Sequence, residues 1–128
     1  MFKRISVLAG FSLCLWTQGA QAQSVFDDLQ AMDDAAAQAE ADEATQRAIK
    51  AAGYEVENHV RRARHYIEEA VADAKNNNSS LACYDLNAAA SEYGEAYIAY
   101  KKASGQGLTE LEDRIAEIHK VERSLGCW

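Results

Sequence analysis

Two cysteines are the residues with the clearest chemistry in this sequence. Cys83 and Cys127 lie on either side of Gly105, each 22 residues away from it. If the flanking segments are antiparallel helices joined near Gly105, the two thiols meet side by side at the open end of the hairpin. In an oxidising compartment such a pair forms a disulfide. We therefore predict a Cys83–Cys127 disulfide that clamps a helical hairpin.

The first 22 residues are typical of a secretory signal peptide. A basic pair at 3–4 precedes a short apolar stretch at 5–16 and a small-x-small cleavage motif at 20–22. The apolar stretch is too short to span a bilayer, which needs about 20 residues. We expect cleavage after residue 22, which removes Cys14 and leaves an even number of cysteines. The mature protein is then expected to be periplasmic or secreted, and not inserted in a membrane.

The charge of the chain restricts its partners. The sequence has 13 Lys and Arg against 20 Asp and Glu, a net charge of −7, and loss of Lys3 and Arg4 with the signal would bring the charge to −9. Such a protein does not concentrate at phosphate backbones, so we expect no nucleic-acid partner. Its charge would instead steer a basic protein towards it. One basic cluster, residues 61–65, stands out in this acidic background.

Histidine and methionine are the residues that could hold a cofactor. His59 and His65 are six apart on a predicted helix, so they face different directions and we expect no metal site. Met32 and His119 lie at similar distances from the two ends of the mature chain, and Met and His are the axial haem ligands of some cytochromes. In length, helix count and these two residues, the mature chain resembles the four-helix b-type cytochromes of the periplasm. The resemblance implies a haem electron carrier with Met32 and His119 as ligands; this is the alternative to a protein without a cofactor, which we favour.

The remaining polar residues favour binding over catalysis. No Ser, His and Asp are spaced as a triad and no glycine-rich phosphate loop is present in the sequence, so we expect no enzyme and assign no catalytic residue. All charged residues from 27 to 43 are negative, and Asp33 and Asp34 lie among them. Tyr84 lies opposite the apolar stripe of its helix and is expected to be exposed. We expect a protein that binds a protein partner, basic in character, through an acidic or tyrosine-bearing helical surface with Asp33, Asp34 and Tyr84 as its candidate residues.

The elements that must position these residues are helices. The sequence has no proline, is rich in strong helix formers, and repeats apolar residues at alternating steps of three and four. Such stripes run through residues 49–74, 83–100 and 108–125. We predict an all-α fold: a small three- or four-helix bundle with a disulfide-clamped antiparallel helical hairpin.

The mature chain, residues 23–128, is predicted to be a single α-helical domain. Its predicted elements are an acidic helix over 24–45, a long helix over 46–76, and the hairpin helices over 80–103 and 109–126. The polar run from Asn76 to Ser80 separates the second element from the third, with Ser79 or Ser80 as helix cap.

The segment between the first two predicted helices allows two arrangements. Either a bend near 41–46 separates them, or one helix runs on and projects beyond a three-helix core; we favour the bend. Gly53 marks either a kink or a close approach of two helices. A projecting helix would expose the apolar stripe of residues 25–40 and would favour homo-oligomerisation through it.

Overall fold

Most helix boundaries in this chain lie at an aspartate, at asparagines or at glycines. The structure is a computed structural model that describes residues 26–127, and the predicted signal peptide lies outside the described residues. A first helix covers 26–41 of the described chain. It is followed by α2 (Glu43–Ala52), α3 (Tyr54–Lys75), α4 (Ser79–Ser104) and α5 (Thr109–Leu125). The prediction of an all-α fold is confirmed.

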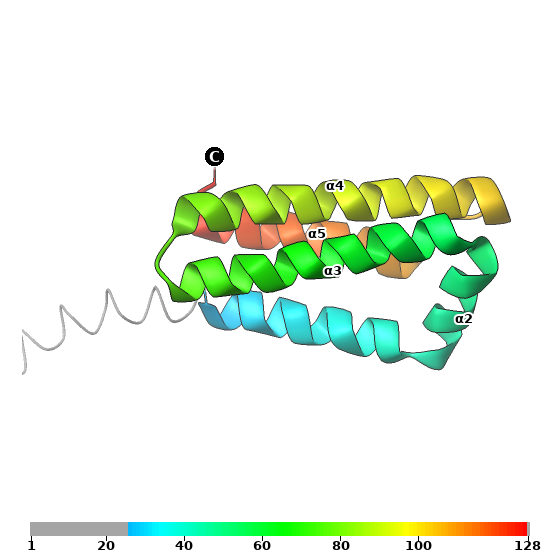
Figure 1. Cartoon of the computed structure of the whole chain (residues 1–128), viewed down its shortest axis with the longest axis horizontal. Helices are drawn as coiled ribbons and strands as arrows, with labels where there is room; N and C mark the ends of the chain where they lie inside the picture. The colour runs from blue at the N-terminus through cyan, green and yellow to red at the C-terminus, as the bar shows by residue number, and fades with distance from the viewer. Residues whose placement is uncertain (1–25, 128) are drawn as a thin grey trace, which may run out of the picture.

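The four long helices run alongside one another as a bundle (Figure 1). The helix 26–41 and α4 lie on opposite sides of α3 in this view, and α5 lies behind them. α3 packs most extensively against α4, and α4 also packs against α5. The short α2 joins the helix 26–41 to α3 at one end of the bundle. Within the described residues, no helix is both long enough and apolar enough to cross a bilayer.

The predicted bend after the first helix is confirmed and lies at Asp42. Asp42 has extended backbone angles, and its carboxylate accepts hydrogen bonds from the backbone N–H (3.3 Å) and the hydroxyl (3.0 Å) of Thr45. This is N-capping, which satisfies a backbone donor at the start of a helix. The predicted acidic helix over 24–45 is therefore wrong at its end, because residues 43–45 belong to α2.

A second bend, at Gly53, divides the predicted long helix over 46–76, so that prediction is wrong. Gly53 has φ 122° and ψ 173°, a region that is essentially restricted to glycine. Its N–H closes α2 onto the carbonyl of Ile49 (3.2 Å), and its own carbonyl accepts the N–H of Glu57 in α3 (3.3 Å). One glycine thus ends a helix and begins the next in a new direction.

The turn between α3 and α4 uses asparagine rather than serine. Asn77 adopts a left-handed conformation with φ 58°, and the side chain of Asn78 accepts a hydrogen bond from the N–H of Leu81 (3.1 Å). The expected cap at Ser79 or Ser80 is wrong because the left-handed residue comes early in the turn. Asn78 therefore takes the cap position, and Ser79 becomes the first residue of α4.

The predicted hairpin is confirmed to within one residue at each end. Gly105 ends α4 with φ 77°, and Gly126 ends α5 with φ 71°. A disulfide joins Cys83 and Cys127, whose Cα atoms lie 5.6 Å apart. Both glycines occupy the left-handed C-cap position that favours glycine.

The apolar stripe of the first helix lies inside the bundle. Leu29 and Ala36 are completely buried and Met32 nearly so. Homo-oligomerisation through residues 25–40 required this stripe to be exposed on a projecting helix. The stripe instead contributes to the protein's own core, which removes the reason for expecting that contact.

α4 buries more of its circumference than its sequence stripe indicates. Tyr93 is completely buried, whereas Tyr97 and Tyr100 of the predicted stripe are half-buried. Alanines at every seventh position are also completely buried: Ala82, Ala89 and Ala96 on α4, and Ala63 and Ala70 on α3. Small side chains at a helix interface permit a close approach of the two axes. α4 therefore has two buried arcs, since it packs against α3 and α5 at once.

Candidate functional site

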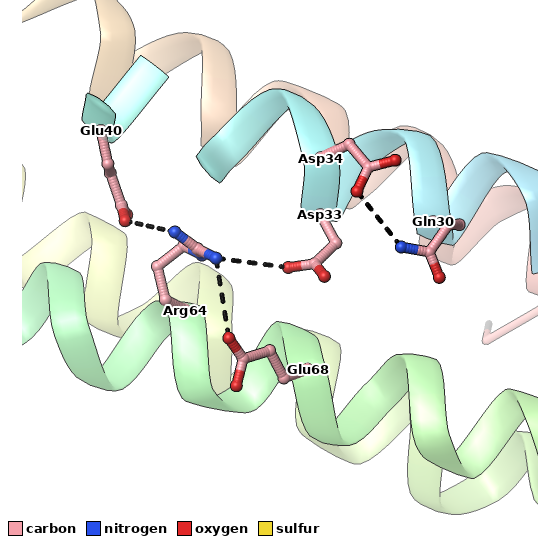
Figure 2. A network of polar contacts seen from close by, with 6 residues as sticks. All are labelled: Gln30, Asp33, Asp34, Glu40, Arg64 and Glu68. Atoms are coloured by element: carbon pink, nitrogen blue, oxygen red, sulfur yellow. Dashed lines mark hydrogen bonds and ion pairs between the residues drawn. The ribbon is translucent and has the colours of Figure 1, made fainter. Parts of the chain in front are cut away.

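Arg64, in the middle of α3, is the centre of an ion cluster that joins this helix to the helix 26–41 (Figure 2). Its Nη1 donates to Glu40 Oε2 at 2.5 Å, and its Nη2 lies 3.8 Å from Asp33 Oδ1 and 3.6 Å from Glu68 Oε1. The guanidinium side chain is only 20% exposed. One mostly buried cation thus lies among three carboxylates from two helices, so negative charge is in excess in this cluster.

Burial changes the protonation equilibria of this cluster. It raises the pKa of Glu40 and of Asp33, because a carboxylate loses hydration as it leaves water. At both residues the charge of Arg64 opposes that effect, and at Glu40 a hydrogen bond from Arg64 adds to the opposition. Arg64 therefore favours the ionised form of both carboxylates between the two helices.

Beneath the ion cluster lies a polar centre within the bundle. A small internal cavity of about 10 Å³ is bounded by Glu40 of the first helix, Tyr93 of α4 and Arg114 of α5. Glu40 Oε1, Tyr93 Oη and Arg114 Nε are buried around this cavity, and Tyr93 and Arg114 both favour the ionised form of Glu40. Burial, reinforced by the charge of Glu40, raises the pKa of Tyr93. The phenol therefore stays neutral and can donate or accept a hydrogen bond, but it cannot act as a base near neutral pH.

A cleft of about 580 Å³ opens to solvent above this polar centre, between α2 and α3. Glu40, Ile49 and Val60 line both the cleft and the internal cavity, so the polar centre lies directly beneath the cleft floor. The rest of the lining comes from charged side chains and one amide: Gln46, Lys50, Glu57, Arg61, Arg64, His65 and Glu68. The cleft therefore combines a small apolar floor with charged walls.

The predicted acidic surface residues do not lie together on one face. Asp33 is directed towards Arg64, and its side chain is 19% exposed. Asp34 is exposed and accepts a hydrogen bond from the amide of Gln30 at 3.3 Å (Figure 2). Asp33 thus holds two helices of the bundle together, and only Asp34 of this pair faces solvent.

Tyr84 is exposed, as its position opposite the apolar stripe predicted. It is 68% exposed, and Leu81 (44%) and Ile98 (51%) are the other large apolar side chains exposed on α4. Tyr84 and Asp34 come from helices on opposite sides of α3 (Figure 1). The two predicted partner-binding features therefore belong to separate surfaces.

The two residues expected as haem ligands lie in different environments. Met32 is 4% exposed and lines a groove of about 360 Å³ with residues of α5 that include Lys120 and Val121. The half-exposed His119 instead places Nδ1 3.0 Å from Glu122 Oε1. This geometry gives the haem alternative no support.

Comparison with known proteins assigns no family to this arrangement. No protein-family model, no curated protein and no solved structure matches the chain. The burial, pairing and charge of the side chains are thus the grounds for assigning a function.

Three buried carboxyl groups were not predicted from the sequence. Glu122 is completely buried and bonded to His119, and the signal for it was its place on the apolar stripe of α5. Asp73 and Asp85 are also nearly buried. Burial, followed by the neighbouring Asp73 carboxyl, raises the pKa of Asp85 to about 7. No local pattern marks Asp73 and Asp85, because their proximity depends on how α3 and α4 pack.

Proposed function

We propose that this chain is a non-catalytic helical protein of the periplasm or the extracellular space that binds a basic protein partner along the outer face of α4. We define the α4 outer face by the residues at alternating steps of three and four on its solvent side: Leu81, Tyr84, Ala88, Ser91, Glu95 and Ile98. One observation carries the proposal. Of the four large apolar side chains exposed in the described part of the chain, three lie on this face.

The spacing along the α4 outer face suits an extended or helical partner segment. Tyr84 and Ile98 are 14 residues apart, which corresponds to about 21 Å along a helix. The residues between them include the small Ala88 and Ser91, which permit a close approach of another backbone. Exposed apolar anchors at helical spacing are a common basis of helix recognition, so the anchors would be Tyr84 at one end and Ile98 at the other.

The Ile98 end of this face supports a basic partner. A groove of about 290 Å³ there is lined by Ile98 and Val56 together with the carboxylates of Glu55 and Glu95; Lys102 also lines it. Lysine and arginine have an apolar stem and a cationic head, which fit apolar walls flanked by carboxylates. The net charge of −7 would in addition increase the rate of encounter with a basic protein.

The acidic first helix is less suited to this function than the predictions suggested. Asp33 and Glu40 are used to hold Arg64, and Asp42 caps α2. Their charges contribute to the structure of the bundle, and they are not available as a set for a partner. The tyrosine-bearing α4 outer face is therefore the surface that we assign to binding.

Recovery of a partner from cells tests the proposal. The tagged protein, purified under native conditions from the periplasm or medium, should carry one enriched protein of high isoelectric point. Tyr84→Ala and Glu95→Lys should each reduce its recovery without lowering the melting temperature. Asp113→Lys makes a comparable charge change at an exposed position of α5 and should leave recovery unchanged. Equal recovery with all three variants would contradict the assignment.

The same preparation tests the compartment and the cofactor. Intact mass should correspond to a chain that begins at Gln23 and contains one disulfide. The haem alternative predicts a Soret band that is lost in Met32→Ala, whereas the proposed function predicts only aromatic absorption.

A further inference from the structure

The basic cluster of this acidic chain lies at the cleft between α2 and α3. Arg61, Arg64 and His65 line the cleft from α3, and Lys50 lines it from α2. The volume of about 580 Å³ is within the range of small-molecule sites in proteins. Three Lys and Arg side chains, with three carboxylates, thus line a cavity of ligand size in a protein whose net charge is −7.

The cations of the cleft differ in their availability. Arg64 is held by three carboxylates, and His65 Nε2 lies 3.5 Å from Glu69 Oε1. The side chains of Lys50 and Arg61, by contrast, make no hydrogen bond or ion pair with another residue of the described chain. They approach the cleft from two different helices. Two cations without an ion-pair partner, one from each helix, are an arrangement that binds an anion by charge-assisted hydrogen bonds.

The charge balance of the cleft fits a ligand with a single negative charge. Glu57 also lines the cleft and forms no pair with another described residue. The charged lining of the cleft is balanced overall, with Lys50, Arg61 and Arg64 against Glu40, Glu57 and Glu68. The unpaired side chains in this lining are two cations and one anion. A monoanion placed between Lys50 and Arg61 would neutralise these three, whereas a dianion would add a further negative charge to a lining that already holds three carboxylates.

The floor of the cleft defines the rest of the ligand. Ile49 and Val60 form an apolar floor, and Gln46 adds an amide at the wall. The completely buried Tyr93, which interacts with Glu40, borders the polar centre just beneath this floor. We propose that the cleft between α2 and α3 is a binding site for a small amphipathic monocarboxylate, whose carboxylate lies between Lys50 and Arg61 and whose apolar body covers Ile49 and Val60. This site shares no residue with the α4 outer face and does not depend on the function proposed for it.

A titration of the full mature protein with hexanoate, monitored by amide chemical shifts, tests the site. Hexanoate should give saturable shifts confined to α2 and the facing residues of α3. Lys50→Ala and Arg61→Ala should each weaken binding about tenfold, the loss expected for one charge-assisted hydrogen bond. Arg62→Ala is the matched control, because Arg62 is an exposed neighbour on the same helix that does not line the cleft. It should bind hexanoate as the wild type does.

Three results would overturn the site. Absence of saturable shifts would show that the cleft does not bind this class of ligand. Equal shifts with hexanol would show that the carboxylate is not recognised. Equal weakening by Arg62→Ala and Arg61→Ala would show attraction by the general charge of α3 rather than a site. None of these results bears on recovery of a protein partner by the α4 outer face.

Discussion

Arg64 holds Glu40, Asp33 and Glu68 around one guanidinium, most of which is buried between α3 and the helix 26–41. Replacing Arg64 with methionine keeps the side chain's apolar stem and leaves Glu40 and Asp33 without their counter-charge. We expect Arg64→Met to lower the free energy of unfolding by about 2 kcal/mol, below the cost for a fully buried pair because the site is partly hydrated. Urea denaturation measures this change in the free energy of unfolding. Arg62→Met, at an exposed neighbour, should change stability little, and equal losses for the two variants would contradict the role of Arg64.

The buried Asp85 makes stability depend on pH. Its pKa is raised from 3.8 to about 7 by burial and by Asp73, with a further contribution from Glu69, while His65 opposes the shift. Between these two values the folded protein retains a proton that the unfolded chain has released. Stability should therefore fall as the pH rises from about 4 to 7 and change little above that range.

Asp85→Asn should remove most of this pH dependence. The variant should be more stable than the wild type at pH 8 and similar to it at pH 4, because an amide needs no proton to remain buried beside Asp73. Thermal melts across this pH range measure the effect. Parallel rises of the melting temperatures of the wild type and of Asp85→Asn from pH 4 to pH 8 would contradict this role of Asp85.

At the scale of residues, the sequence predicted the exposure of a side chain better than the residues that it contacts. Tyr84 was correctly predicted to be exposed, because its position relative to one apolar stripe was sufficient. The environment of Asp33 could not be predicted in this way, since Arg64 is 31 positions away in the sequence and meets it only in the folded bundle. Glu122 is completely buried, and its position on an apolar stripe was the sequence signal that could have predicted this burial.

At the scale of elements, glycine has opposite roles at two positions. Gly53 has a backbone conformation that other residues adopt only with strain, although a methyl group there would meet nothing within 4 Å. Gly94 lies inside α4 and also has free space for a methyl group. We expect Gly53→Ala to destabilise the protein by about 2 kcal/mol and Gly94→Ala to stabilise it by roughly 0.5–1 kcal/mol.

Chemical denaturation of both glycine variants provides a matched comparison, because the same atoms are added at two open sites. Opposite signs of the change in unfolding free energy are expected. Unchanged or raised stability of Gly53→Ala would contradict the backbone strain expected for a side chain at this position.

The hairpin elements could be predicted closely because several local signals coincide there. Glycines end both helices, the cysteines lie at equal distances from Gly105, and an apolar stripe runs along each helix. The division between α2 and α3 could not be predicted in the same way. Gly53 continues the apolar period of its neighbours, so that period agrees equally with a kink and with an uninterrupted helix, and the backbone angle that decides between them depends on packing.

At the scale of the whole molecule, the disulfide is a major contributor to stability. It closes a loop with a sequence separation of 44, for which the chain-entropy model gives about 4 kcal/mol. Reduction, or the double variant Cys83→Ser and Cys127→Ser, should lower the unfolding free energy by up to this amount. Denaturation with and without reductant measures it. The double variant should be insensitive to reductant, and an equally insensitive wild type would contradict the contribution.

The arrangement of the helices decides which surfaces can cooperate. The sequence predicted the fold class, since its helical periodicity and lack of proline point in one direction. It could not predict that the helix 26–41 and α4 lie on opposite sides of α3, because that depends on which stripes pack together (Figure 1). This arrangement separates Asp34 from Tyr84, and the α4 outer face is the surface that we propose for a partner.

Site-specific photocrosslinking in living cells tests this assignment most directly. A photoreactive amino acid would replace Tyr84, Ile98 or, as a control on α5, Asp113. Binding along the α4 outer face predicts that positions 84 and 98 crosslink to the same basic protein, and that position 113 does not. Crosslinks from position 113 alone, or no product from positions 84 and 98 above that of the control, would contradict it.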